Sequence, residues 1–145
     1  EKQAFGKAHA SLTRAMETAD GEDLVQLQAS LESIDQLATN RLARTRSFIN
    51  DELFAQAAAK LHDLEGDFEG MAQAAAAKES RKIIEAMPEA KDDFKAYKLL
   101  VTAQAALAKS SKAATRRKAK GILERIVKDY PNTATAKIAR GLLRG

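Results

Sequence analysis

The chain has 145 residues, of which 30% are charged and 45% hydrophobic, with no cysteine, two prolines and a formal net charge of +4. This composition excludes disulfides, thiolate metal ligands and a cysteine nucleophile. No apolar run reaches the ~18 residues that a membrane-spanning helix needs. The length suits a single domain with its own core, so we expect one domain over 1–145. Because residue 1 is Glu1 rather than methionine, we expect a processed chain or a piece of a longer one.

Alanine is the most abundant residue, with thirty copies. It loses no side-chain entropy in a helix, whereas proline, which breaks helices, occurs only twice. The sequence therefore predicts an all-α fold whose helices pack closely across small side chains. Few aromatic residues are available to stack on nucleic-acid bases, which argues against a base-binding platform.

Apolar residues at steps of three and four predict the first two helices, over 3–20 and 24–38. Gly21 can adopt the left-handed conformation that closes the first helix, and Asp23 is the expected N-cap of the second. Thr39-Asn40 forms a weak break, through which this helix could instead continue.

A third helix is predicted over 41–65, where Gly66 is expected to stop it. Asp67 is the expected cap of a fourth helix, which ends at Pro88 because proline cannot continue a helix. Asp92 or Asp93 is the expected cap of the fifth helix.

The predicted turn before the sixth helix is Ser110-Ser111, and Pro131 closes that helix before Thr133 caps the last. Short turns favour antiparallel neighbours, so we expect about seven helices stacked as hairpins in a right-handed α-solenoid. The expected helix pairs are about 3–38, 41–87 and 92–130, followed by a capping helix over 133–144.

Two stretches match at an offset of 43 residues. Ile83-Ile84-Glu85-Ala86-Met87-Pro88 aligns with Ile126-Val127-Lys128-Asp129-Tyr130-Pro131. Further along, Ala96, Leu99 and Leu100 align with Ala139, Leu142 and Leu143. Each stretch contains the apolar end of a helix, then a proline, and then a new helix that is predicted to pack against the preceding one. A period of this length with paired helices is typical of an α-solenoid.

The last predicted pair resembles a degenerate tetratricopeptide repeat, with the following helix continuing the pattern. Counted back from Pro131, residues Ile126, Leu123 and Ala119 occupy the small and apolar positions of that motif's second helix. Leu100, Ala103 and Leu107 fit its first helix with a longer turn, while the motif's tryptophan and glycine-tyrosine pair are absent. The tail from Ile126 to Thr133, with Ala136 and Ala139, is similar to tetratricopeptide-like proteins of the bacterial envelope.

Residues 60–145, including Glu65-Gly66-Asp67 before a helix, also resemble helical regions that follow thioredoxin-like domains in exported bacterial proteins. This resemblance implies an exported or periplasmic chain in preference to a cytoplasmic one. It implies no redox activity, because the chain has no cysteine.

No group of residues predicts catalysis, a cofactor site or a metal site. His9 and His62 are the only histidines and lie on different predicted helices, with His9 expected to be exposed. His62, near Asp63 and Glu65, reads as part of a solvated helix face. Ser110-Ser111 lacks a general base and reads as a turn. We therefore expect no catalytic residue, no cofactor and no metal.

The charge is divided along the chain. Residues 109–145 hold eleven basic and two acidic side chains, a charge of +9, whereas the rest carries thirteen basic and eighteen acidic ones, or −5. The candidate interaction patch on the sixth helix is Lys112, Arg116, Arg117, Lys118 and Lys120. It is either a solvated outer face or a docking surface for acidic protein or phosphates.

We expect a non-catalytic protein–protein interaction or spacer scaffold whose partner is a peptide, its own N-terminal domain or another copy. Stacked helix pairs expose extended surfaces that accept helices or peptides in other repeat proteins. One alternative is a basic module that binds nucleic acid or anionic lipid; missing aromatic residues on the basic segment disfavour nucleic acid. Another is a helical accessory domain of a larger thioredoxin-like protein.

Overall fold

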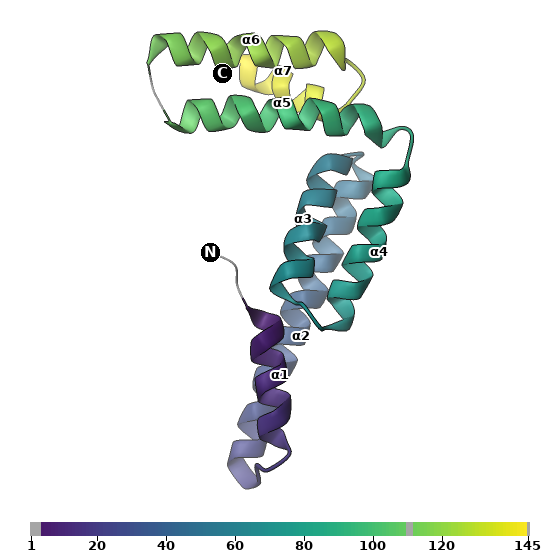
Figure 1. Ribbon diagram of the computed structural model, residues 1–145, viewed down its shortest axis with the longest axis vertical. Helices are drawn as coiled ribbons and strands as arrows, with labels where there is room; N and C mark the ends of the chain where they lie inside the picture. Colours follow the sequence, from purple (N-terminus) through teal and green to yellow (C-terminus); the bar gives the residue numbers. More distant parts are fainter. Residues whose placement is uncertain (1–3, 110–111, 145) are drawn as a thin grey trace. The chain divides into compact units, whose positions relative to one another are not determined.

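The computed structural model describes residues 4–109 and 112–144, and these residues form seven helices and no strand (Figure 1). The all-α prediction is confirmed, and helices pack mainly with their neighbours in sequence. The helices are α1 (Phe5–Met16), α2 (Gly21–Asn50), α3 (Phe54–Asp67), α4 (Ala72–Ala86), α5 (Ala90–Lys109), α6 (Ala113–Asp129) and α7 (Ala134–Arg144). The predicted turn at Ser110-Ser111 lies outside the described residues.

Helix α2 runs without interruption through Thr39 and Asn40, which is the alternative that the weak break left open, so the separate third helix over 41–65 is wrong. The helix ends after Asn50 instead, where Glu52 adopts a positive φ of 59°. The N–H of Leu53 donates to the carbonyl of Phe48 at 2.8 Å, and the N–H of Glu52 donates to that of Ile49 at 3.0 Å. These paired bonds satisfy the last carbonyls of the helix, with glutamate in the left-handed position that glycine usually takes.

The helix end predicted at Gly66 also differs from the structure. Helix α3 continues through Gly66 to Asp67, and the turn that follows uses Gly70, whose φ is +88°. Asp67 therefore ends α3 and is not a cap of α4. Its carboxylate lies 2.8 Å from a guanidinium nitrogen of Arg41 on α2. At the first turn of the chain, Gly21 takes a positive φ of 54° as predicted, but α1 already ends at Met16 and Gly21 is the first residue of α2.

Backbone contacts divide the chain into two compact units. The first comprises the chain up to Ser47 together with Ala57–Ile83, and the second comprises Phe48–Gln56 together with the chain from Ile84 onward. Each unit has its own buried residues and is described separately below.

In the first unit, α1 is anchored through its first turn. The rings of Phe5 and Phe68 stack with centroids 5.1 Å apart, and the guanidinium of Arg41 lies 5.6 and 5.5 Å from the two centroids. Gly6 is the one buried residue of α1, and a Cβ atom there would collide with the backbone carbonyl of Glu69. The absence of a side chain at residue 6 therefore lets the two backbones approach.

In the second unit, α5, α6 and α7 pack against one another. The shared core consists of small and branched aliphatic side chains: Ala96, Leu100, Ala103, Ala119, Leu123, Ile126, Ala136 and Ala139. The small and apolar positions predicted for α6, Ala119, Leu123 and Ile126, belong to this core, and Ile122, Val127 and Tyr130 also pack on it. Leu107 and Leu142, which are apolar residues of α5 and α7, are 40% and 47% exposed and lie outside this core.

The 43-residue repeat holds in part. Ala96 and Ala139 are both fully buried, as their alignment predicts. Ile83, however, is 63% exposed while its counterpart Ile126 is fully buried. Ile84 is the buried residue of the first copy, so the two helix ends match at an offset one residue shorter.

Candidate functional site

The predicted basic patch lies on the first half of α6. This segment is helical because Ala119, Leu123 and Ile126, at helical spacing, are buried against the core of the second unit. All five patch residues are exposed: Lys112, Arg116, Arg117, Lys118 and Lys120. The structure thus brings the sequence-predicted residues together on one exposed segment.

The start of α6 concentrates positive charge. Lys112 occupies the N-cap position and its side chain makes no capping hydrogen bond, and the first turn contains no acidic residue. The N-terminus of a helix carries a partial positive charge. Cations placed there add to that charge instead of offsetting it. The first two turns of α6 therefore attract anionic groups.

The patch spreads over the exposed part of the helix instead of following one line. At about 100° per residue, Arg116 and Lys120 share a side, while Arg117 and Lys118 lie roughly 100° and 200° further round. Lys120 approaches Glu124 at 3.9 Å, with both side chains well exposed. An exposed pair of this kind contributes little stability, so it leaves Lys120 able to engage another partner.

Asp92 and Asp93 have separate roles. Helix α5 starts at Ala90, so neither is its N-cap, and both belong to its first turn. Asp92 is exposed and pairs with Lys95 at 2.9 Å. Asp93 is 2% exposed and its carboxylate accepts the N–H of Ala55 at 3.0 Å and the N–H of Thr135 at 3.1 Å.

Asp93 therefore joins the first turns of α3, α5 and α7 within the second unit. Sequence reasoning missed this role because its partners lie 38 and 42 residues away. The cap predicted for α7 is confirmed, since Thr133 Oγ1 accepts the N–H of Ala136 at 3.1 Å. Asp93 adds a second acceptor to the same helix end.

The histidines lie in different surroundings. His9 was expected to be exposed, but it is half-buried against α2, with Nε2 3.8 Å from Oδ2 of Asp35. His62 is exposed on α3. Within residues 4–109 and 112–144, no group of three or more histidine and carboxylate side chains is arranged to hold a metal ion. None of the helices described there is long and apolar enough to cross a membrane.

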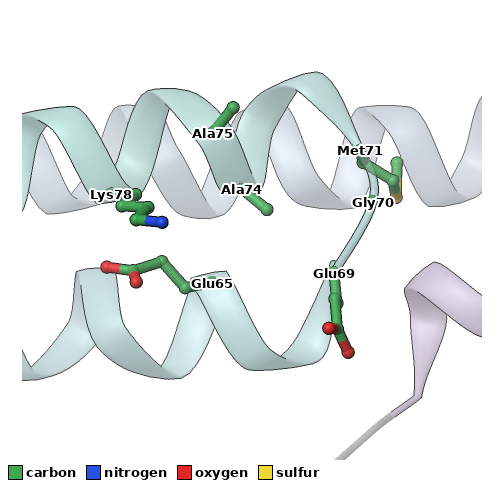
Figure 2. Close-up of a pocket in the computed structure, with 7 residues that line it drawn as sticks. All are labelled: Glu65, Glu69, Gly70, Met71, Ala74, Ala75 and Lys78. Atoms are coloured by element: carbon green, nitrogen blue, oxygen red, sulfur yellow. The ribbon is translucent and has the colours of Figure 1, made fainter.

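A pocket of about 380 Å³ lies at the junction of α3 and α4 (Figure 2). Met71 and Ala74 are its buried apolar residues, and Glu65, Glu69 and Lys78 supply its charges. Glu65 binds the guanidinium of Arg81 through both oxygens, at 2.6 and 3.2 Å. These hydrogen bonds hold the pKa of Glu65 below its ordinary value. A carboxylate kept ionised in this way is poorly suited to act as a general acid.

Comparison with protein-family models, with curated proteins and with solved structures finds no match for this chain. The proposals that follow rest on the residues and geometry described above.

Proposed function

We propose that the chain is a non-catalytic protein-interaction scaffold that binds an acidic polypeptide surface through the basic patch of α6. The observation that carries the proposal is the exposure of all five patch cations on a helix whose other face is packed into the core of the second unit. A packed helix presents its charges with little loss of backbone freedom on binding. Long cationic side chains then steer an acidic partner onto the surface.

The helical arrangement supports this use. Helices α5, α6 and α7 pack in sequence order across alanines, with Ala96, Ala119 and Ala139 fully or almost fully buried. This is the packing that a degenerate tetratricopeptide-like unit requires, and such units bind peptides and helices on their exposed faces. The step from architecture to function is by analogy.

The rival partner is a phosphate-bearing molecule, either nucleic acid or anionic lipid. The uncapped start of α6 favours it, because helix N-termini attract phosphate. The spread of the cations round α6 disfavours it, because they do not follow a single line along a phosphate backbone. No aromatic residue lies between Tyr97 and Tyr130 to stack on a base.

A binding titration separates these partners. A labelled polyglutamate peptide, single-stranded DNA and phosphatidylserine vesicles are compared at ~0.15 M ionic strength, where screening reaches about 8 Å. In the patch variant, Arg116, Arg117, Lys118 and Lys120 are replaced by Gln. In the control variant, the exposed lysines Lys82, Lys91, Lys98 and Lys109 are replaced by Gln, so the net charge is the same.

We expect the patch variant to bind polyglutamate about thirtyfold more weakly than the parent, and the control to bind as the parent does. The factor follows from four exposed ion pairs of roughly 0.5 kcal/mol each. Tighter binding to DNA or vesicles than to the peptide, lost in the patch variant, would replace the proposal with its rival. Equal losses in both variants would show that net charge alone, and not α6, governs binding.

A further inference from the structure

The helical hairpin formed by α1 and the first half of α2 has an incomplete core. From Lys7 to Leu37 no residue is buried, although Gly6 and Ala38 on either side are. The apolar side chains along the hairpin are only half-buried: Leu12, Met16, Leu24, Leu27, Leu31, Ile34 and Leu37. Two helices cover each other on one side only, and most helical stability comes from packing of the apolar face. The hairpin therefore retains apolar surface for a further element.

A groove lies on this hairpin near the turn that joins its two helices. It has a volume of about 390 Å³, and its walls include Ala15 and Ala19 from the α1 side and Leu27 and Ser30 from α2. Small side chains on both walls allow a third helix to approach closely. Val25, also near the start of α2, is 63% exposed.

The charge of the hairpin indicates what kind of helix binds to it. Between Phe5 and Leu37 there are six carboxylates and two cations, Lys7 and Arg14. Four of the carboxylates are exposed around the turn that joins the helices: Glu17, Asp20, Glu22 and Asp23. A second hairpin of the same kind would be repelled, so the surface fits a basic helix.

The chain itself supplies a helix of that description. Six exposed cations lie on α6, namely Arg116, Arg117, Lys118, Lys120, Arg125 and Lys128, against two acidic residues, Glu124 and Asp129. The outer side of α6 also has small residues, Ala114 and Gly121, which lets its backbone approach a groove. The two surfaces are complementary in charge and occur once in each molecule.

We infer that the α1–α2 hairpin of one copy binds the outer side of α6 of a second copy, so that the chain self-associates head to tail. This inference rests on the proposed function, and it identifies the acidic surface that α6 binds as the α1–α2 hairpin of another copy. The contact is heterologous, because different surfaces meet, and it forms either a closed ring or an open chain of copies.

The test uses two charge-reversed variants of the full chain. In the α6 variant, Arg116, Arg117, Lys118 and Lys120 are changed to Glu. In the hairpin variant, Glu17, Asp20, Glu22 and Asp23 are changed to Lys. The control has Lys82, Lys91, Lys98 and Lys109 changed to Glu, and circular dichroism establishes that each variant is helical.

Sedimentation velocity is measured over a concentration series at low and at physiological salt. We expect the parent and the control to associate, and each reversed variant alone to associate at least about thirtyfold more weakly. An equimolar mixture of the two reversed variants should regain association, because each then meets an oppositely charged surface. This rescue cannot arise from variants that are merely unfolded.

The inference is overturned by a parent that is monomeric throughout, by a reversed variant that associates as the parent does, or by a mixture that shows no rescue. Salt-dependent compaction without a change in mass would place the contact within one chain and would also overturn it. A monomeric parent that still binds polyglutamate through α6 refutes self-association and leaves the proposed function standing. A parent chain that neither self-associates nor binds polyglutamate through α6 refutes both the inference and the proposed function.

Discussion

At the scale of single residues, the structure depends on one buried carboxylate. Asp93 accepts the N–H groups of Ala55 and Thr135, which are orphan donors in the first turns of α3 and α7. The charge also lies in the first turn of its own helix, where a helix dipole favours it. One side chain therefore accepts hydrogen bonds from two helix ends and places its charge at the start of a third.

Replacing Asp93 with Ala should lower the free energy of unfolding by about 2–4 kcal/mol, since it leaves two buried N–H groups without acceptors. Asp93→Asn, which keeps one acceptor oxygen, should lose about half as much. The exposed neighbour provides the control: Asp92→Ala should stay within about 0.5 kcal/mol of the parent. Urea denaturation measures all three. Equal stability of the Asp93→Ala variant and the parent would show that these bonds are dispensable.

The ion pair between Glu65 and Arg81 predicts that the stability of the protein depends on pH. Hydrogen bonds from Arg81 lower the pKa of Glu65 from the ordinary value of 4.5, so the folded state binds this proton less readily than the unfolded chain. The stability that the ion pair contributes is present above pH 4.5 and is lost as the pH falls through the lowered pKa. Glu65→Gln should therefore destabilise the protein at pH 7 and progressively less below pH 4.5. Denaturation from pH 7 to pH 3 checks this; a difference that grows on acidification would contradict it.

At the scale of helices, close packing in the second unit depends on alanine. Ala119 is 1% exposed and Ala139 is fully buried, both in the core shared by α5, α6 and α7. A larger side chain at either position must displace a neighbouring helix or adopt a strained rotamer.

Ala119→Leu and Ala139→Leu should each lower the free energy of unfolding by about 1–3 kcal/mol because of this overpacking. Ala114→Leu, on the exposed side of α6, makes the same chemical change outside the core and should have little effect. Chemical denaturation of the three variants provides the comparison. If all three behaved like the parent, the helices would not be in contact at these alanines.

Local patterns in the sequence predict the helices and most of their inward positions, but not every helix end. The end of α2 was missed because Glu52 takes a left-handed conformation in which glycine is the expected residue. The end of α3 was misplaced because Gly66, a plausible stop, lies inside the helix, while Gly70 forms the turn. The basic patch was visible from charge alone. Asp93 was not, since its role depends on backbone groups far away in the sequence.

At the scale of the whole molecule, the fold combines a conventional alanine-rich packing with an uneven distribution of charge. Residues 109–145 carry +9 and the rest −5, and the described acidic and basic surfaces are exposed. This distribution favours association through electrostatics, so binding by the chain should weaken as salt is added.

Folding of the whole chain should not require a metal ion. No cluster of potential metal ligands occurs among residues 4–109 and 112–144, and cysteine is absent from the sequence. Thermal unfolding curves with and without a chelator should therefore coincide. A marked decrease in melting temperature in the chelator would reveal a structural metal site, because a bound ion stabilises the folded state by mass action.

The half-buried hairpin of α1 and α2 also has a consequence for local unfolding. Amide protons are protected to the extent that a segment must open, and segments with few buried contacts open at low free energy. Between Lys7 and Leu37 no side chain is buried, whereas α5, α6 and α7 share a fully buried core. The amide protons of the hairpin should therefore exchange with deuterium before those of α6. Slower exchange in the hairpin at high protein concentration would show that a second copy binds to it.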